Sequence, residues 1–219
     1  MNKTDKQLQQ DVEAELRFDP KVNSAKIGVT VEKGAVSLTG TIDTWAEKWA
    51  AEVATKRVCG VRTVAQDLKV KLLGDHKQSD GDIAAAVLGA LKWDVLVPST
   101  VTAKVENGMV TLEGKVTRNY QRESAERAVR YLMGVTYVNN SISLSPDVSP
   151  TEVKTQVEAA LHRQATHDAK SIHVATSAGK VTLTGHASSW TMIDDAARAA
   201  WAAPGVTDVA NQMTVSIVQ

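Results

Sequence analysis

Apolar residues along this chain change their spacing in a fixed order, and that order occurs three times. Residues four positions apart, as on one side of a helix, come first: Leu8, Val12 and Leu16; Ile83, Val87 and Leu91; Val153, Val157 and Leu161. Alternating apolar residues then predict two strands, for example at residues 27–31 and 36–38. A stripe of small residues next predicts a second helix, and a final alternating run predicts a closing strand. The pattern therefore predicts the order α-β-β-α-β in each of three copies.

The two strands of each predicted hairpin carry the motif G-x-V-x-L-x-G, and a later glycine is followed at once by valine. The motif glycines are Gly34 and Gly40, Gly108 and Gly114, and Gly179 and Gly185, and the later ones are Gly60, Gly134 and Gly205. We expect the first glycine of each motif to supply the positive φ of a tight hairpin. We expect the second to lie where a helix approaches the sheet too closely for a side chain, and the later one to end a helix in a left-handed cap.

A phosphate-binding loop is the alternative interpretation of these glycines. That motif needs a strand before the glycines, a helix after them and a following Lys-Ser or Lys-Thr pair, which this chain does not provide. Structural roles are therefore favoured for all of them.

Polar, turn-rich segments at residues 73–80 and 145–150 separate the copies. The predicted domains are residues 4–73, 79–145 and 149–219. Helix start signals stand near the beginning of each domain: Thr4 with Gln7, Ser79 with Asp82, and Ser149 with Glu152. The chain is thus predicted to be an α+β protein of three tandem αββαβ domains.

These motifs resemble the BON domain, a family named for its bacterial occurrence in osmotically inducible and nodulation-related proteins. The G-x-V-x-L-x-G hairpin, the second helix and the closing G-V-x-x-V carry the resemblance, which covers almost the whole chain. It implies two helices on one face of a small mixed β-sheet in each domain. It also implies a non-enzymatic binding module that contacts phospholipid surfaces, envelope proteins or other large partners. One cytoplasmic branch of the family is associated with potassium.

Charge and hydropathy narrow the choice of partner and compartment. Lys and Arg together number 25 and are balanced by 25 Asp and Glu, so we expect no nucleic-acid partner. No cleaved signal sequence and no uninterrupted apolar stretch long enough to span a bilayer is visible in the sequence. We therefore expect a protein without a transmembrane segment, cytoplasmic as written and periplasmic if the sequence is a mature fragment.

Residue types that carry catalysis are scattered along the chain. The single cysteine, Cys59, excludes an intramolecular disulfide and a Cys-rich zinc site, and it has no adjacent histidine. His173 and His186 lie diagonally on the outward face of the third predicted hairpin and are a candidate metal pair. The other copies have Gly, Thr or Lys at or near these positions and no third ligand is apparent, which favours surface histidines. We expect no catalytic residue, no metal and no cofactor.

Three aromatic residues lie off the inward stripe of the predicted second helices. At about 100° per residue, Trp49 and Trp201 point away from the cores of their own domains. Tyr131 also lies off the stripe. Aromatic side chains in such positions pack on a neighbouring domain or on a partner. The sequence favours packing between copies, and an external protein or membrane surface is the alternative.

The second copy differs most from the other two. After its first predicted helix it has an apolar loop that includes Trp93, Leu96 and Val97, where the first copy is more polar. Its second predicted helix carries Arg118 and Arg122, which could contact anionic lipid headgroups. Glutamates at i,i+4 spacing before the later arginines of that helix favour ordinary surface ion pairs instead. The hypothesis is a partner or lipid contact at the loop, with both arginines as secondary contacts.

The sequence thus favours a non-enzymatic scaffold that binds protein or phospholipid surfaces, with osmotic or envelope stress as its setting. The alternative is a cytoplasmic potassium-binding sensor, because backbone carbonyls at the Gly-Val turns could coordinate the ion without any sequence signature.

Overall fold

The structure is a computed structural model of the chain and describes residues 3–74, 77–145, 153–164 and 172–215. Domain 1 contains α1 (Asp5–Phe18), a short 3-10 helix η1 (Ser24–Lys26), β1 (Ile27–Glu32), β2 (Ala35–Ile42), α2 (Trp45–Arg57) and β3 (Thr63–Val70). Domain 2 contains α3 (Asp80–Trp93), β4 (Thr102–Glu106), β5 (Met109–Glu113), β6 (Lys115–Val116), α4 (Asn119–Arg130), β7 (Tyr137–Asn140) and β8 (Ser143–Leu144). Domain 3 contains α5 (Val153–Gln164), β9 (Ile172–Ser177), β10 (Lys180–Ala187), α6 (Trp190–Ala202) and β11 (Asp208–Val215). The mixed α+β architecture of three tandem αββαβ domains is confirmed.

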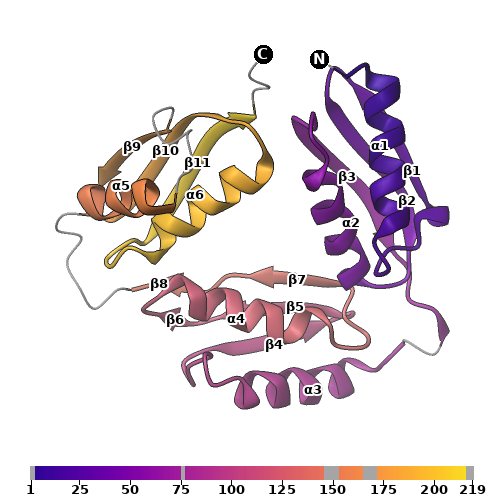
Figure 1. Cartoon of the computed structure of the whole chain (residues 1–219). Coiled ribbons are helices and arrows are strands. Elements are labelled where there is room, and N and C mark those ends of the chain that lie inside the picture. Colours follow the sequence, from indigo (N-terminus) through magenta and orange to yellow (C-terminus); the bar gives the residue numbers. More distant parts are fainter. Residues whose placement is uncertain (1–2, 75–76, 146–152, 165–171, 216–219) are drawn as a thin grey trace.

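Each domain has a mixed sheet whose central strand carries the motif. In domain 1, β2 pairs with β1 in antiparallel register and with β3 in parallel register. Val36 and Leu38 of the motif are fully buried on one face of β2. The apolar residues of α1 and the alanines of α2 belong to the same core, so both helices cover that face. The domains are visible as separate units in Figure 1.

Hairpin turns are held by the residue that begins the first helix, which the sequence did not reveal. The carboxylate of Asp5 accepts hydrogen bonds from the backbone N–H groups of Lys33 and Gly34, at 2.7 and 3.2 Å. Asp80 does the same for Asn107 and Gly108, at 2.8 and 2.9 Å. The expected positive φ of the hairpin glycines is confirmed in all three domains. Of the predicted helix caps, Thr4 and Ser79 accept from Gln7 and Asp82, whereas Ser149 and Glu152 lie outside the described residues.

Two expectations about the other glycines are wrong. No helix approaches Gly40 or Gly114: a Cβ at either would collide with a backbone carbonyl just before the first strand, that of Lys26 or Thr100. Both glycines also have positive φ.

The later glycines lie in a turn beyond the helix and do not cap it. The helix α2 ends at Arg57, and Gly60 is the third residue of the turn closed by Val61 N–H to Val58 carbonyl. Gly134 and Gly205 take the same place after α4 and α6. Their positive φ is the conformation that the third residue of such a turn requires.

Candidate functional site

The second helices α2, α4 and α6 lie toward the middle of the molecule, where the three domains meet (Figure 1). Trp45, the first residue of α2, packs against the core of domain 2. Its ring meets the ring of Tyr137 edge-on, with 4.8 Å between the centroids. The turn at residues 132–135 of domain 2 borders the same place, which keeps a pocket of about 170 Å³. Trp45 therefore joins domain 1 to domain 2.

Trp190, the first residue of α6, makes the corresponding contact between domain 3 and domain 1. Its ring packs against the core of domain 1 as well as that of domain 3. Its Nε1 donates a hydrogen bond of 2.8 Å to the carbonyl of Val61, and Lys56 Nζ lies 5.4 Å from the ring centroid. Asp194 lies on the same helix, where loss of hydration raises the pKa of its carboxyl and the nearby Lys56 lowers it in part.

The aromatic residues expected to face outward take different places. The Arg130 guanidinium of domain 2 lies over the Trp49 ring, 4.3 Å from its centroid. Arg122 lies over the Trp201 ring at 4.9 Å. Both tryptophans therefore contact an arginine of another domain. Tyr131 is about half exposed and lines the pocket beside Trp45.

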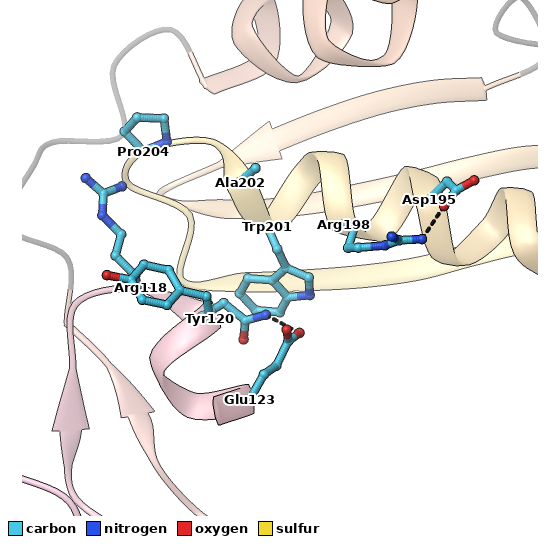
Figure 2. A pocket seen from close by; sticks show the side chains of 9 residues that line it. Arg118, Tyr120, Glu123, Asp195, Arg198, Trp201, Ala202 and Pro204 are labelled. Carbon is cyan, nitrogen blue, oxygen red and sulfur yellow. Dashed lines mark hydrogen bonds and ion pairs between the residues drawn. The ribbon is translucent and has the colours of Figure 1, made fainter. Parts of the chain in front are cut away.

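An open cleft separates α4 of domain 2 from the end of α6 in domain 3, and Figure 2 shows the side chains that line it. Its volume is about 920 Å³. Domain 2 contributes Arg118, Asn119, Tyr120 and Glu123, and domain 3 contributes Asp195, Arg198, Trp201, Ala202 and Pro204. We call this space the α4–α6 cleft.

Polar groups in the α4–α6 cleft are only partly satisfied. Asn119 donates from Nδ2 to Glu123 at 2.7 Å. Arg198 pairs with Asp195. Asn119 is only 4% exposed. Its buried Oδ1 has no donor among the described residues. An unused hydrogen-bond acceptor therefore lies just beneath the wall of the cleft.

Domain 2 also exposes apolar side chains on its outer side, along α3 and the loop after it. Trp93 is 89% exposed and Val95 is 95% exposed. Leu96 and Leu88 are exposed as well. We call these four residues the α3 strip. Val97, predicted to share this contact, is half-buried against the core of domain 2, and its part in a partner contact stays a prediction.

Arg118 and Arg122, predicted as secondary contacts of that loop, face domain 3. Arg118 lines the α4–α6 cleft and Arg122 lies over Trp201. An ion pair at the expected spacing joins Glu126 and Arg130 at 2.6 Å, but Arg130 is largely buried against Trp49 at the domain junction, so the pair does not lie on an open surface. The basic side of this helix is thus directed toward the domain junction and not toward the α3 strip.

A family model for the BON domain matches residues 4–71, 79–146 and 149–216. The chain belongs to the BON family. A curated relative is the osmotically-inducible protein Y of Escherichia coli (strain K12), 30% identical over 136 residues, which are 60% of this chain and 68% of that protein. The expected family is therefore confirmed.

Solved structures similar to the chain include two of CdsD, a structural protein of the type III secretion system of Chlamydia trachomatis. Both are 14% identical to this BON protein, with a TM-score of 0.27. One match covers 94% of this chain and 91% of the other, and the second, to the C-terminal domain, covers 98% of each.

Within the described parts of the three BON domains, no helix is both long and apolar enough to cross a membrane. No group of three or more His, Cys, Asp or Glu side chains there is arranged to hold a metal ion. In domain 3, His186 Nδ1 lies 2.8 Å from the hydroxyl of Thr214. Potassium coordination by carbonyls of the Gly-Val turns stays a prediction.

Sequence reasoning missed Trp45, Trp190 and Leu88. A signal for the two tryptophans was present, because each directly follows the Thr or Ser that begins a second helix, Thr44 and Ser189. In the second BON domain Asn119 stands at that place. An aromatic residue at this position in domains 1 and 3 indicates a contact that domain 2 lacks.

Proposed function

We propose that the protein is a non-enzymatic scaffold whose second BON domain docks on an anionic phospholipid surface through the α3 strip. The observation that carries the proposal is the exposure of Trp93, Val95, Leu96 and Leu88 along α3 and the loop after it. Membership of the BON family and similarity to an osmotically inducible protein support a binding role in stress.

The composition of α3 fits a helix that lies on a membrane surface. Its inward residues Ile83, Val87 and Leu91 are buried, as in any helix that packs on a sheet. Its exposed side is also apolar, since Ala84, Ala85, Ala86 and Leu88 occupy it. Tryptophan prefers the boundary between headgroups and acyl chains. Trp93, the last residue of α3, would lie at this boundary in the docked protein. Burial of this strip would remove apolar area from water at roughly 25 cal/mol per Å².

Electrostatic attraction adds to this docking without dominating it. Lys92 is exposed beside Trp93 and is positioned to approach headgroup phosphates. The chain as a whole carries no net charge. Binding should therefore prefer anionic vesicles to neutral ones and weaken with added salt.

Co-sedimentation with vesicles tests the proposal. We expect the wild-type chain to sediment with vesicles of equal parts phosphatidylcholine and phosphatidylglycerol. The combined changes Trp93→Ser, Val95→Ser and Leu96→Ser should reduce partitioning roughly ten-fold or more, because all three side chains are exposed and insert together.

Phe18→Ser is the matched control, because Phe18 ends α1 as Trp93 ends α3 and is 82% exposed. That variant should sediment like the wild type. Equal sedimentation of the triple variant and the wild type, with unchanged circular dichroism, would contradict the lipid proposal. Binding to a protein surface would then be the explanation of the strip.

A further inference from the structure

We infer that the α4–α6 cleft is a receptor for an indole ring, the tryptophan side chain of a partner protein. The inference starts from the contacts between the domains, which follow one scheme. The first residue of a second helix reaches the Gly-Val turn of a neighbouring domain. Trp45 of domain 1 does so in domain 2, and Trp190 of domain 3 does so in domain 1.

The third contact of this scheme, from domain 2 to domain 3, has no tryptophan at the start of the second helix. Asn119 stands at the first position of α4, where the other two second helices have Trp45 and Trp190. Across from Asn119 lie Ala202 and Pro204, just before the Gly-Val turn of domain 3. No tryptophan of domain 2 fills this contact, and the α4–α6 cleft remains beside the nearly buried Asn119.

The volumes of the spaces beside Trp45 and beside Asn119 fit this interpretation. Beside Trp45 the remaining space is about 170 Å³, whereas the α4–α6 cleft measures about 920 Å³. Trp201 lines the cleft from domain 3, but its ring stacks with Arg122 and leaves the cleft open. An aromatic side chain from outside the chain can enter where Trp45 or Trp190 would have inserted.

Hydrogen-bonding groups at the cleft favour a ring that donates and does not accept. An indole has one N–H donor and no acceptor. Asn119 Oδ1 is an acceptor without a donor among the described residues, and because it exposes less than 1 Å², the Asn119 side chain must turn before a ring in the cleft can reach it. In the contact between domains 3 and 1, the indole of Trp190 donates to the carbonyl of Val61. Val206 is the corresponding residue of domain 3; it is buried and does not itself line the cleft, and its carbonyl accepts no hydrogen bond within the described part of the chain.

The surroundings of the cleft explain how a peptide could carry the ring. Tyr120 is half exposed at its edge and offers an aromatic surface. Arg118 has no ion pair or side-chain hydrogen bond among the described residues, so it can bind a carboxylate or main-chain carbonyl beside the tryptophan. Figure 2 shows Arg118 and Tyr120 on the domain 2 side of the cleft and Trp201 opposite them.

The test is a titration of the full chain with N-acetyl-tryptophan amide, followed by amide chemical shifts in NMR. We expect weak saturable binding, with shifts at Asn119, Tyr120, Ala202 and Val206. N-acetyl-leucine amide is the control for simple apolar contact and should shift these signals several-fold less. Equal shifts from both probes, or no saturable shift, would overturn the proposal.

Two variants fill the cleft from its two sides. Asn119→Trp should remove the probe-induced shifts and raise the thermal unfolding midpoint, because the chain then supplies its own indole. Ala202→Trp, at an exposed position, should also remove the shifts even if Asn119→Trp fails to fold, and Ala202→Ser is its matched control. Unchanged probe binding in a folded Trp variant would place the binding elsewhere. A tryptophan-containing peptide that binds more tightly than the amide alone supports the partner as its source, whereas equal affinity overturns that assignment.

Discussion

The helices α1 and α3 occupy the same place in domains 1 and 2 and bury the same three apolar positions, yet their outer surfaces differ. Where α1 has Gln9, Gln10, Asp11 and Glu13, α3 has Ala84, Ala85, Ala86 and Leu88. Inward positions are constrained by the core that both domains share. Outer positions depend on what surrounds the domain, so the difference agrees with the contact that we propose for domain 2.

The ends of the two helices differ in the same direction. Asp19 follows α1 and pairs with Arg57 at 2.9 Å, while its carboxylate also accepts the backbone N–H of Lys21. Asp94 follows α3 and accepts the backbone N–H of Leu96. At the position of Arg57, domain 2 has Tyr131, and at that of Lys21 it has Leu96. A polar end in domain 1 is thus replaced by an apolar one in domain 2.

Substitution of Gly40 or Gly114 tests whether the two domains really share one frame. Gly40→Ala and Gly114→Ala should each destabilise their domain by about 2 kcal/mol or more, because φ is positive and the new Cβ meets a backbone carbonyl. Chemical denaturation of the full chain measures the loss.

Gly89→Ala in α3 is the control for that experiment, since nothing lies within 4 Å of the added Cβ. It should be neutral or slightly stabilising, because alanine favours helix more than glycine does. A stable Gly114→Ala variant beside a disrupted Gly40→Ala variant would show that the frames differ.

Transfer of the α3 surface to α1 sharpens the comparison. The changes Gln9→Ala, Gln10→Ala, Asp11→Ala and Glu13→Leu should increase vesicle co-sedimentation roughly two- to five-fold, because Phe18 then extends a second apolar surface. The gain should be smaller than the loss caused by removal of the α3 strip, since Pro20 and Lys21 remain. No gain at all would show that the loop at Val95 and Leu96, and not the helix surface, decides binding.

The smallest effect concerns the polar end of α1. The backbone N–H of Lys21, followed by Arg57, holds the pKa of Asp19 below its usual value, partly opposed by burial. A carboxyl with a lowered folded-state pKa stabilises the fold above its unfolded pKa, and this contribution is lost as pH falls through the folded pKa. Asp19→Asn should therefore cost about 0.5–1 kcal/mol at pH 7, since Arg57 is partly exposed.

That cost should begin to shrink near the ordinary pKa of an aspartate, about 3.9, and disappear only below the lowered folded-state pKa of Asp19. Thermal unfolding of wild type and variant across this pH range measures it. Asp94→Asn is the matched variant in domain 2, where no arginine occupies the position of Arg57. A pH-independent difference would attribute the effect to packing and not to charge.

Local sequence patterns predicted the helices, the strands and the hairpin pairing. Apolar residues spaced two apart indicate a strand, and apolar residues spaced four apart indicate a helix. These patterns could not predict what Gly40 and Gly114 contact, because the approaching carbonyl comes from the segment before β1 or β4. Helical geometry placed Trp49 off the core of its own domain, but the same prediction for Trp201 is wrong, because Trp201 also packs against the core of domain 3. The arginine partner of each tryptophan lies in another domain and could not be predicted from the helix alone. Exposure of Trp93 followed from its place at the end of the first helix of domain 2, whereas burial of Val97 depends on how the loop returns to the core.

The domain contacts also separate this chain from a linear array. In an open stack of repeats each unit touches only its neighbours in sequence. Here the third unit returns to the first through Trp190 and Val61, so two units that are not neighbours in sequence are joined directly. Loss of the indole at residue 190 would therefore loosen the arrangement of all three units and not only that of one adjacent pair.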